Sequence, residues 1–152
     1  GVAVGAGAVI ALACDLRIVA RSARFGFVFP QVGLCGADMG AAYLLPRVVG
    51  LGRANEILFT GELVSAEEAF RIGLANRLVD DGRALEESMA LARKLADGPA
   101  FAHAMTKQMI EDEHDMSLDV PSPSATQPAT HGSCSARPTS AVWSWYGAFH
   151  FT

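Results

Sequence analysis

A turn of small residues near the start of the chain, Gly5-Ala6-Gly7, is the first place where chemistry could occur. It follows an apolar segment, residues 1–4, that is typical of a buried strand, and it precedes an apolar run typical of a short helix. Amides at a helix N-terminus have no partner within the helix, so those of Ala6 and Gly7 are expected to point outward. Such amides bind a phosphate or a carboxylate, or stabilise negative charge on a carbonyl oxygen. Close packing of a helix with small residues is the simpler explanation of the same spacing, and the turn alone leaves both open.

The elements that position this turn follow from the apolar pattern and its breaks. Strands are predicted over residues 16–20, 24–29 and 75–79, and helices over 39–49, 53–60, 65–72, 84–97 and from about residue 101. Pro46 is expected to kink or end the first of these helices. Ser65 and Glu68 have the spacing of a capping box, and Gly61 and Gly73 are expected to end helices.

Composition limits the classes of function. The net charge is −4 and no basic cluster is present, which argues against nucleic acid as a partner. The apolar run at residues 1–14 is shorter than the roughly 20 residues that span a bilayer, and it lacks the positive leader of a signal peptide. Cys14 and Cys35 are expected to be small buried residues in a reducing cytosol, so a cytoplasmic protein is predicted, with no membrane partner.

The segment Gly1-Val-Ala-Val-Gly-Ala-Gly, followed by Ala-Leu-Ala-Cys14-Asp-Leu-Arg-Ile-Val-Ala and by residues 23–26, resembles the signature of the crotonase (enoyl-CoA hydratase/isomerase) superfamily. The similarity continues through residues 33–34, 36–40, 45–50, 58–61 and 66–76, and it extends over residues 1–118. It implies an α/β protein with the ClpP/crotonase-like fold of repeated ββα units. The chain starts within a predicted strand and without Met, so a partial domain truncated at its N-terminus is expected, from a parent that is a homotrimer or hexamer.

The resemblance implies that the ligand is an acyl-CoA thioester. No metal and no separate cofactor is implied, since CoA is part of the substrate. In the superfamily two backbone amides form an oxyanion hole for the thioester oxygen as negative charge builds on it. One of these amides falls on Ala6 here. The other is expected to come from a segment upstream of Gly1, so the chain alone should be severely impaired.

Hydration in this superfamily also uses two glutamates that position and activate water. Counted residue by residue, these positions fall on Val9 and Phe29, and neither side chain can transfer a proton. Gln31 lies beside the second position, but an amide is no base. Two-glutamate hydration is therefore not supported, and Gly5, Val9, Phe29 and Met39 are instead expected to bind substrate, the last three as the lining of the acyl pocket.

Asp38 is the remaining candidate for acid/base catalysis. It lies near the position where dienoyl-CoA isomerases of the superfamily carry an acidic residue, once one residue is inserted between Gly33 and Asp38. An apolar acyl pocket would raise the pKa of Asp38 toward neutrality, so that the carboxylate could move protons at the α or γ carbon of the thioester. As the N-cap of the following helix it would have a lowered pKa and be a poorer base. Both roles remain open.

The predicted activity is that of an enoyl-CoA hydratase, a lyase, or of an enoyl-CoA isomerase, as in fatty acid metabolism. Two alternatives stand beside it. The absent glutamates favour a catalytically inactive acyl-CoA-binding protein. The N-terminal truncation expected above and the character of the C-terminal segment favour a degenerate, truncated homologue.

Residues 119–152 differ from the rest of the chain. From residue 120 on they are rich in Ser, Thr and Pro, contain Arg137 as their single charged residue, and show no helical period. A foreign, disordered tail, such as a shifted reading frame produces, is predicted. The alternative is an aromatic docking segment around Trp143, Trp145 and Tyr146.

Overall fold

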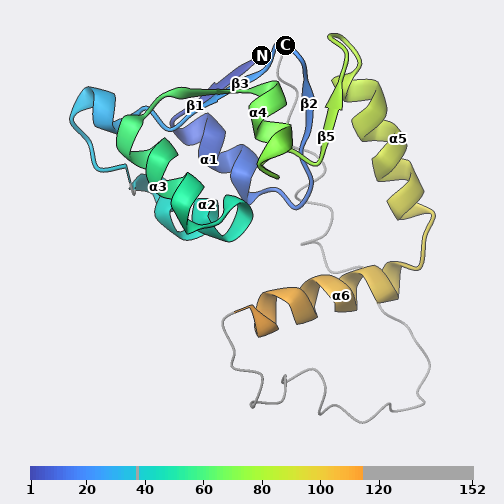
Figure 1. Cartoon of the computed structure of the whole chain (residues 1–152). Coiled ribbons are helices and arrows are strands. Elements are labelled where there is room, and N and C mark those ends of the chain that lie inside the picture. The colour runs from blue at the N-terminus through green and yellow to red at the C-terminus, as the bar shows by residue number, and fades with distance from the viewer. Residues whose placement is uncertain (37, 115–152) are drawn as a thin grey trace. The chain divides into compact units, whose positions relative to one another are not determined.

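The computed structural model describes residues 1–36 and 38–114 (Figure 1). The chain divides into two compact units, Gly1–Ala100 and Phe101–Thr152. The described part of the first unit is mixed α/β, with helices and two small sheets, as predicted. The proposed tail over residues 119–152, its aromatic alternative and the boundary at residue 118 lie outside the described residues.

Strand β3 (Arg24–Gly26) is the centre of a three-stranded sheet. Strand β1 (Val2–Val4) pairs with it in parallel and β4 (Leu63–Ser65) pairs antiparallel on its other side. Parallel neighbours need a long connection, and helix α1 (Ala6–Ala13) lies within it (Figure 1). A Cβ on Gly26 would lie 2.6 Å from the Leu63 side chain and 2.8 Å from that of Val4. Glycine therefore lets the flanking side chains meet over the central strand.

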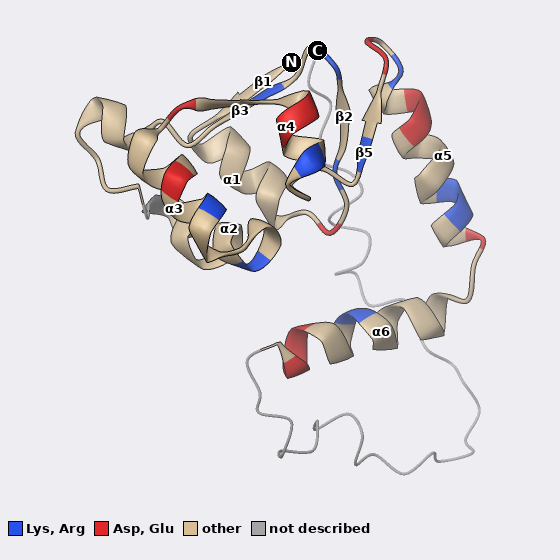
Figure 2. Ribbon diagram, viewed as in Figure 1, with Lys and Arg blue, Asp and Glu red and all other residues tan. Residues whose placement is uncertain are grey.

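The second sheet joins β2 (Ile18–Ala20) and β5 (Arg77–Val79) in parallel. Helix α5 (Ala84–Ala96) packs against β2. This helix carries acidic residues in its first turn and basic residues in its last (Figure 2), the distribution that the helix dipole favours. All three elements were predicted from the sequence, the strands with longer bounds.

Helices α2 (Ala41–Val49) and α3 (Leu51–Thr60) pack against each other. Pro46 was expected to kink or end the first helix, and it does not end it, because α2 continues to Val49, the predicted last residue. Proline removes one intrahelical hydrogen bond, but Leu45 beside it is fully buried, and packing of this kind stabilises the last turn. Gly61 ends α3 with a φ of 63°, as predicted.

Helix α4 (Ala66–Arg71) begins with half of the predicted capping box. The hydroxyl of Ser65 accepts a hydrogen bond from the Glu68 amide at 3.2 Å. The Glu68 carboxylate pairs with the Arg71 guanidinium at 2.5 Å, and this hydrogen bond lowers the pKa of Glu68. The helix ends one residue before Ile72, and Gly73 follows with a φ of 80°.

The core of the first unit lies between α1, the first sheet and the helices α2 to α4. The largest side chains that are fully buried in it are Phe27, Leu45 and Leu74. Val64 of β4 also contributes to the core. This strand was not predicted, because residues 62–65 offer only three strand residues between two helices.

Helix α6 (Ala100–Glu113) belongs almost entirely to the second unit. The helix includes acidic residues up to Glu113, so it extends through the segment where its C-terminal end was expected to fray. Lys107 lies 3.8 Å from the Glu111 carboxylate one turn away, which offsets part of the unfavourable charge at this end. Within the described residues, no helix has both the length and the apolar character needed to cross a membrane.

Candidate functional site

The glycine turn joins β1 to α1 in one residue. Gly5 has φ 54° and ψ −123°, a conformation that only glycine adopts without strain. Its amide donates a hydrogen bond to the Gly26 carbonyl at 2.8 Å, which extends the pairing of β1 with β3. Its carbonyl accepts from the Val9 amide at 3.1 Å, the first hydrogen bond of α1. The turn is therefore fixed on both sides by backbone hydrogen bonds.

Ala6 is the first residue of α1 and is exposed. Gly5 has no side chain to cap the helix. Within residues 1–36 and 38–114, the Ala6 amide has no backbone carbonyl as a hydrogen-bond partner. The structure thus leaves a fixed donor at the positive end of a helix dipole, which is the arrangement that binds a developing oxyanion.

Two of the predicted pocket residues lie beside this turn. A Cβ on Gly5 would lie 3.9 Å from Cε1 of Phe29, so the Phe29 ring borders the turn. Phe29 and Val9 are each only 6% exposed and share the hydrophobic core. These apolar side chains therefore stabilise the elements around the Ala6 amide by packing in the core.

The segment with Asp38 and Met39 forms a 3-10 turn, η2 (Asp38–Gly40), that packs against α1 and α2. Asp38 is the first residue of η2, and the structure describes only its backbone. Met39 is 58% exposed and has a φ of 54°, which is uncommon for a residue other than glycine. Gly40 is the N-cap residue of α2, so Asp38 lies two residues ahead of the N-cap position expected for it.

Gln31 has a structural contact that the sequence did not reveal. It lies in the 3-10 turn η1 (Phe29–Val32), and its side-chain amide donates a hydrogen bond to the Gly61 carbonyl at 2.7 Å. This contact attaches η1 to the end of α3. Gly36 packs against the same helix, because a Cβ there would lie 2.5 Å from the Leu58 carbonyl oxygen. The loop that leads to Asp38 is therefore held on α3 at two points.

A mainly apolar groove of about 550 Å³ lies between this loop and helices α2 and α3. Cys35 is exposed at its edge, which corrects the expectation that this thiol is buried, whereas Cys14 is half-buried. The residues that line the groove are Pro30, Leu34, Cys35, Gly36, Ala42, Pro46, Leu51, Asn55, Leu58 and Phe59.

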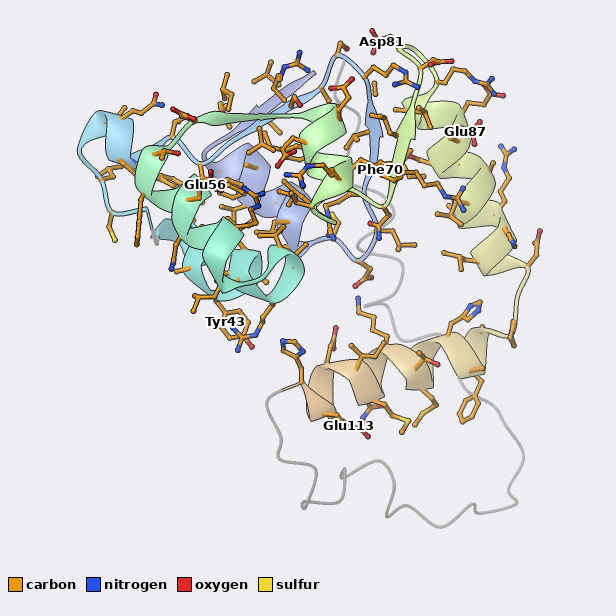
Figure 3. The ribbon with its side chains drawn as sticks, in the orientation of Figure 1. Tyr43, Glu56, Phe70, Asp81, Glu87 and Glu113 are labelled. Carbon is orange, nitrogen blue, oxygen red and sulfur yellow. The ribbon has the colours of Figure 1, made fainter. Side chains whose placement is uncertain are left out.

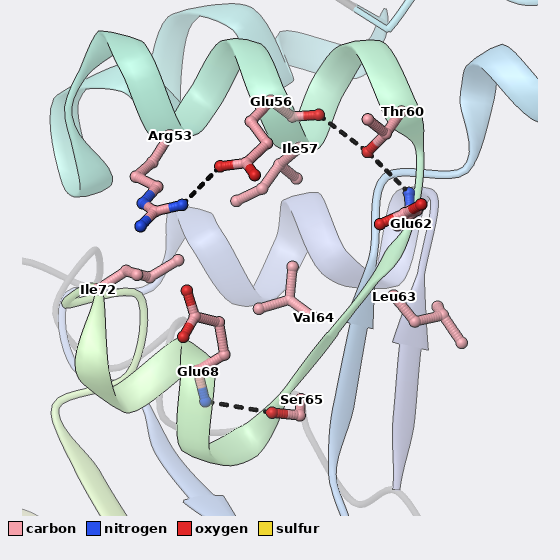
Figure 4. A pocket seen from close by; sticks show the side chains of 10 residues that line it. All are labelled: Arg53, Glu56, Ile57, Thr60, Glu62, Leu63, Val64, Ser65, Glu68 and Ile72. Atoms are coloured by element: carbon pink, nitrogen blue, oxygen red, sulfur yellow. Dashed lines mark hydrogen bonds and ion pairs between the residues drawn. The ribbon is translucent and has the colours of Figure 1, made fainter.

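A smaller cavity of about 260 Å³ separates α3 from β4 and α4 (Figure 4). Glu56 and Glu68 reach toward it from opposite sides, and Arg53 pairs with Glu56 at 2.6 Å. The described residues that line the groove and this cavity do not include the predicted Gly5, Ala6, Val9, Phe29 or Met39. The turn at Ala6 is exposed and the side chains of Val9 and Phe29 are directed into the core, which accounts for the difference.

The family of the chain follows from comparison with known proteins. The profile of the family Enoyl-CoA hydratase/isomerase matches residues 1–125. The chain belongs to this family, and its structural neighbours share the crotonase fold.

Among curated relatives, 1,2-epoxyphenylacetyl-CoA isomerase of Escherichia coli K12 is 42% identical over 119 residues, which are 78% of this chain and 45% of the relative. Among solved structures, a protein of Streptomyces coelicolor A3(2), provisionally assigned as an enoyl-CoA hydratase, has 60% identity and a TM-score of 0.76 over 78% of this chain and 43% of its own. A protein of Thermobifida fusca YX, provisionally assigned as an enoyl-CoA hydratase and solved with acetoacetyl-CoA, has 34% identity and a TM-score of 0.73. The match covers 78% of this chain and 46% of that protein. The chain thus spans less than half the length of these relatives.

Proposed function

We propose that the chain takes part in shifting a double bond of an acyl-CoA thioester, with the Ala6 amide as an oxyanion donor and Asp38 as the acid/base. The observation that carries the proposal is the amide of the exposed residue Ala6, which has no backbone partner among the described residues and lies at the start of a helix. Two relatives support the choice of ligand. One is named an isomerase of a CoA thioester, and the other was solved with acetoacetyl-CoA.

The proposed reaction moves one proton. The Asp38 carboxylate removes a proton from the α or γ carbon, and the electron pair of the broken C–H bond moves toward the thioester oxygen. The Ala6 amide donates a hydrogen bond to the oxygen as its negative charge grows. Asp38 then returns the proton at the other end of the conjugated system, so the double bond has moved and no atom is gained or lost. The shift is redox-neutral overall, so it calls for no redox cofactor, and in this proposal the Ala6 amide stabilises the charge on the oxygen.

Two-glutamate hydration is the less favoured reaction. By the resemblance in sequence, its glutamates are expected at the positions of Val9 and Phe29, and both of these side chains pack in the core. Addition of water needs a base for the nucleophile and an acid for the carbon, whereas a double-bond shift needs only one group that takes and returns a proton. Asp38 is therefore assigned to isomerisation.

Transfer of the α proton to solvent tests the proposal. With butyryl-CoA in D2O, the chain should exchange the α protons, as followed by NMR, and Asp38→Asn should slow exchange by about 100-fold or more. Asp97→Asn makes the same chemical change at the C-terminus of α5 and should have no effect. If the unsubstituted chain, called the parent chain from here on, and Asp38→Asn exchange α protons at the same rate, the role of Asp38 is refuted.

The rival is an inactive acyl-CoA-binding protein, which the apolar residues at Val9 and Phe29 favour. Calorimetry with butyryl-CoA separates the alternatives. Binding without α-proton exchange would support the rival, and neither binding nor exchange would support a degenerate homologue.

A further inference from the structure

Arg17 lies in the connection between α1 and β2 and joins segments that are far apart in the sequence. Its half-buried guanidinium donates through Nε to the Leu74 carbonyl at 2.5 Å. Through Nη1 it donates to the Leu12 carbonyl at 3.3 Å and to the Cys14 carbonyl. One cation thus satisfies carbonyls at the C-terminal end of α1 and a carbonyl just after α4.

The backbone of Arg17 reinforces this connection. Its amide donates to Oδ1 of Asn76 at 2.7 Å, and its carbonyl accepts from the Asn76 amide at 2.8 Å. Burial lowers the pKa of Arg17, but a guanidinium retains its charge in proteins. The C-terminal end of α1 is therefore bound on several sides to the segment that leads into β5.

The two ends of α1 are treated differently. At the C-terminal end, Cys14 caps the Ile10 carbonyl through its thiol at 3.4 Å and the Ala11 carbonyl through its amide at 3.3 Å, while Arg17 binds Leu12. At the N-terminal end there is no side-chain cap. A helix of this length, about 12 Å, behaves as a short rod, so a displacement at one end is transmitted to the other.

We infer that Arg17 is a positioning residue for the Ala6 amide: by fixing the C-terminal end of α1, it sets where the N-terminal amide meets the thioester oxygen. The inference rests on the proposed function. It adds a residue that does not touch substrate, and that the sequence alone did not single out. A misplacement of about 1 Å at a reacting centre costs roughly 100-fold in rate, so accurate placement of α1 matters.

A pair of ligands that differ in one oxygen isolates this role. Butyryl-CoA has a thioester carbonyl, whereas S-butyl-CoA has a methylene in its place. The ratio of their dissociation constants reports the contact with the carbonyl oxygen alone, because partial unfolding or damage to CoA binding weakens both ligands equally. Calorimetry on the full chain measures both constants.

The parent chain should prefer the thioester. Arg17→Met, which keeps an unbranched side chain as far as the position of Nε and removes the donors, should lower the preference by about fivefold, which corresponds to the loss of one hydrogen bond. Arg17→Lys cannot reach Leu74 and the end of α1 together, and should lower it by about threefold. Arg21→Met removes an exposed arginine that pairs with Asp80 and should leave the ratio unchanged.

The outcomes separate the inference from the proposed function. No preference for the thioester in the parent chain would refute the oxyanion role of Ala6. A preference in the parent that Arg17→Met or Arg17→Lys retains in full would overturn the role of Arg17 and leave Ala6 standing. If Arg17→Met does not fold, as circular dichroism would show, Arg17→Lys decides the question.

Discussion

Replacement of Ala6 by proline removes the one atom on which the proposed chemistry depends, the amide hydrogen. Ala6 is the first residue of α1, the helical position that tolerates proline best, because the missing hydrogen has no partner within the helix. The preceding residue also permits the change. Gly5, at φ 54° and ψ −123°, has the mirror image of the extended conformation that residues adopt before proline. Ala6 is exposed, so the ring has room.

The expected effects on stability and on reactivity differ widely. The free energy of unfolding should change by less than about 1 kcal/mol, because proline at a compatible position costs the folded state little. The rate of α-proton exchange should fall by about 100- to 1,000-fold, the usual cost of removing one oxyanion donor. The dissociation constant of butyryl-CoA should rise by only about fivefold, since the oxygen carries little charge before reaction.

A matched control exists in the same chain. Leu51 is the first residue of α3, follows the positive-φ Gly50, and is 67% exposed. Leu51→Pro therefore makes the same backbone change at another helix start. Urea unfolding measures stability, and NMR in D2O measures exchange for both variants.

The comparison has a clear negative outcome. If Ala6→Pro folds and exchanges α protons as fast as Leu51→Pro and the parent chain, the Ala6 amide is not an oxyanion donor. If both variants lose exchange together, proline damages the fold in general, and Ala6→Gly, which retains the amide hydrogen, should then restore exchange.

Two other variants test the surroundings of the site. Gln31→Glu would set a carboxylate against the Gly61 carbonyl, so the free energy of unfolding in urea should fall by about 1 to 3 kcal/mol. The variant should not add water to crotonyl-CoA, and a gain of hydratase activity would contradict the structural role of Gln31. The Ser22 amide donates to Asp81 (labelled in Figure 3) at 2.9 Å, and this hydrogen bond lowers the pKa of Asp81. A lowered pKa in the folded state stabilises the protein above the unfolded-state pKa of about 3.9, and this stabilisation is lost as the pH falls through the folded pKa. Asp81→Ala should therefore have a lower urea midpoint than the unsubstituted chain at pH 7, and the same midpoint at pH values below the folded pKa. If the midpoint of Asp81→Ala stays lower in acid, the charge of Asp81 is not the cause of the difference.

Local signals in the sequence predicted most of the elements around the site. The glycine turn, the end of α3 at Gly61 and the cap of α4 at Ser65 each depend on the conformation or hydrogen bonding of one residue, so the residue type alone indicates them. Strand β4 escaped prediction because its three residues are specified by their pairing with β3, a contact between segments almost 40 positions apart. Pro46 does not end α2, one of the two effects expected of it, because packing of Leu45 outweighs a local rule.

The candidate site divides in the same way. Ala6 was placed at a helix start by the small residues around it, and the structure has α1 beginning there. The roles of Gln31 and Arg17 could not be predicted, because their partners, Gly61 and Leu74, are 30 and 57 residues away. Side chains that donate to distant carbonyls leave no periodic pattern, and only the folded chain reveals them.

The two ends of α1 differ in how their backbone groups are capped, and this difference bears on which residues the chain has at each end. Stability alone would favour Ser, Thr, Asp or Asn as the N-cap, which is worth about 1 kcal/mol. The chain instead has Gly5 there, while Cys14 and Arg17 bind the carbonyls at the other end. A capping side chain would accept from the amide of Gly7 or Ala8, beside the Ala6 amide of the proposed oxyanion site, and it would lie where the Phe29 ring borders the turn. An uncapped start on a firmly held helix stabilises little by itself, and this combination is what binding of a charged oxygen requires.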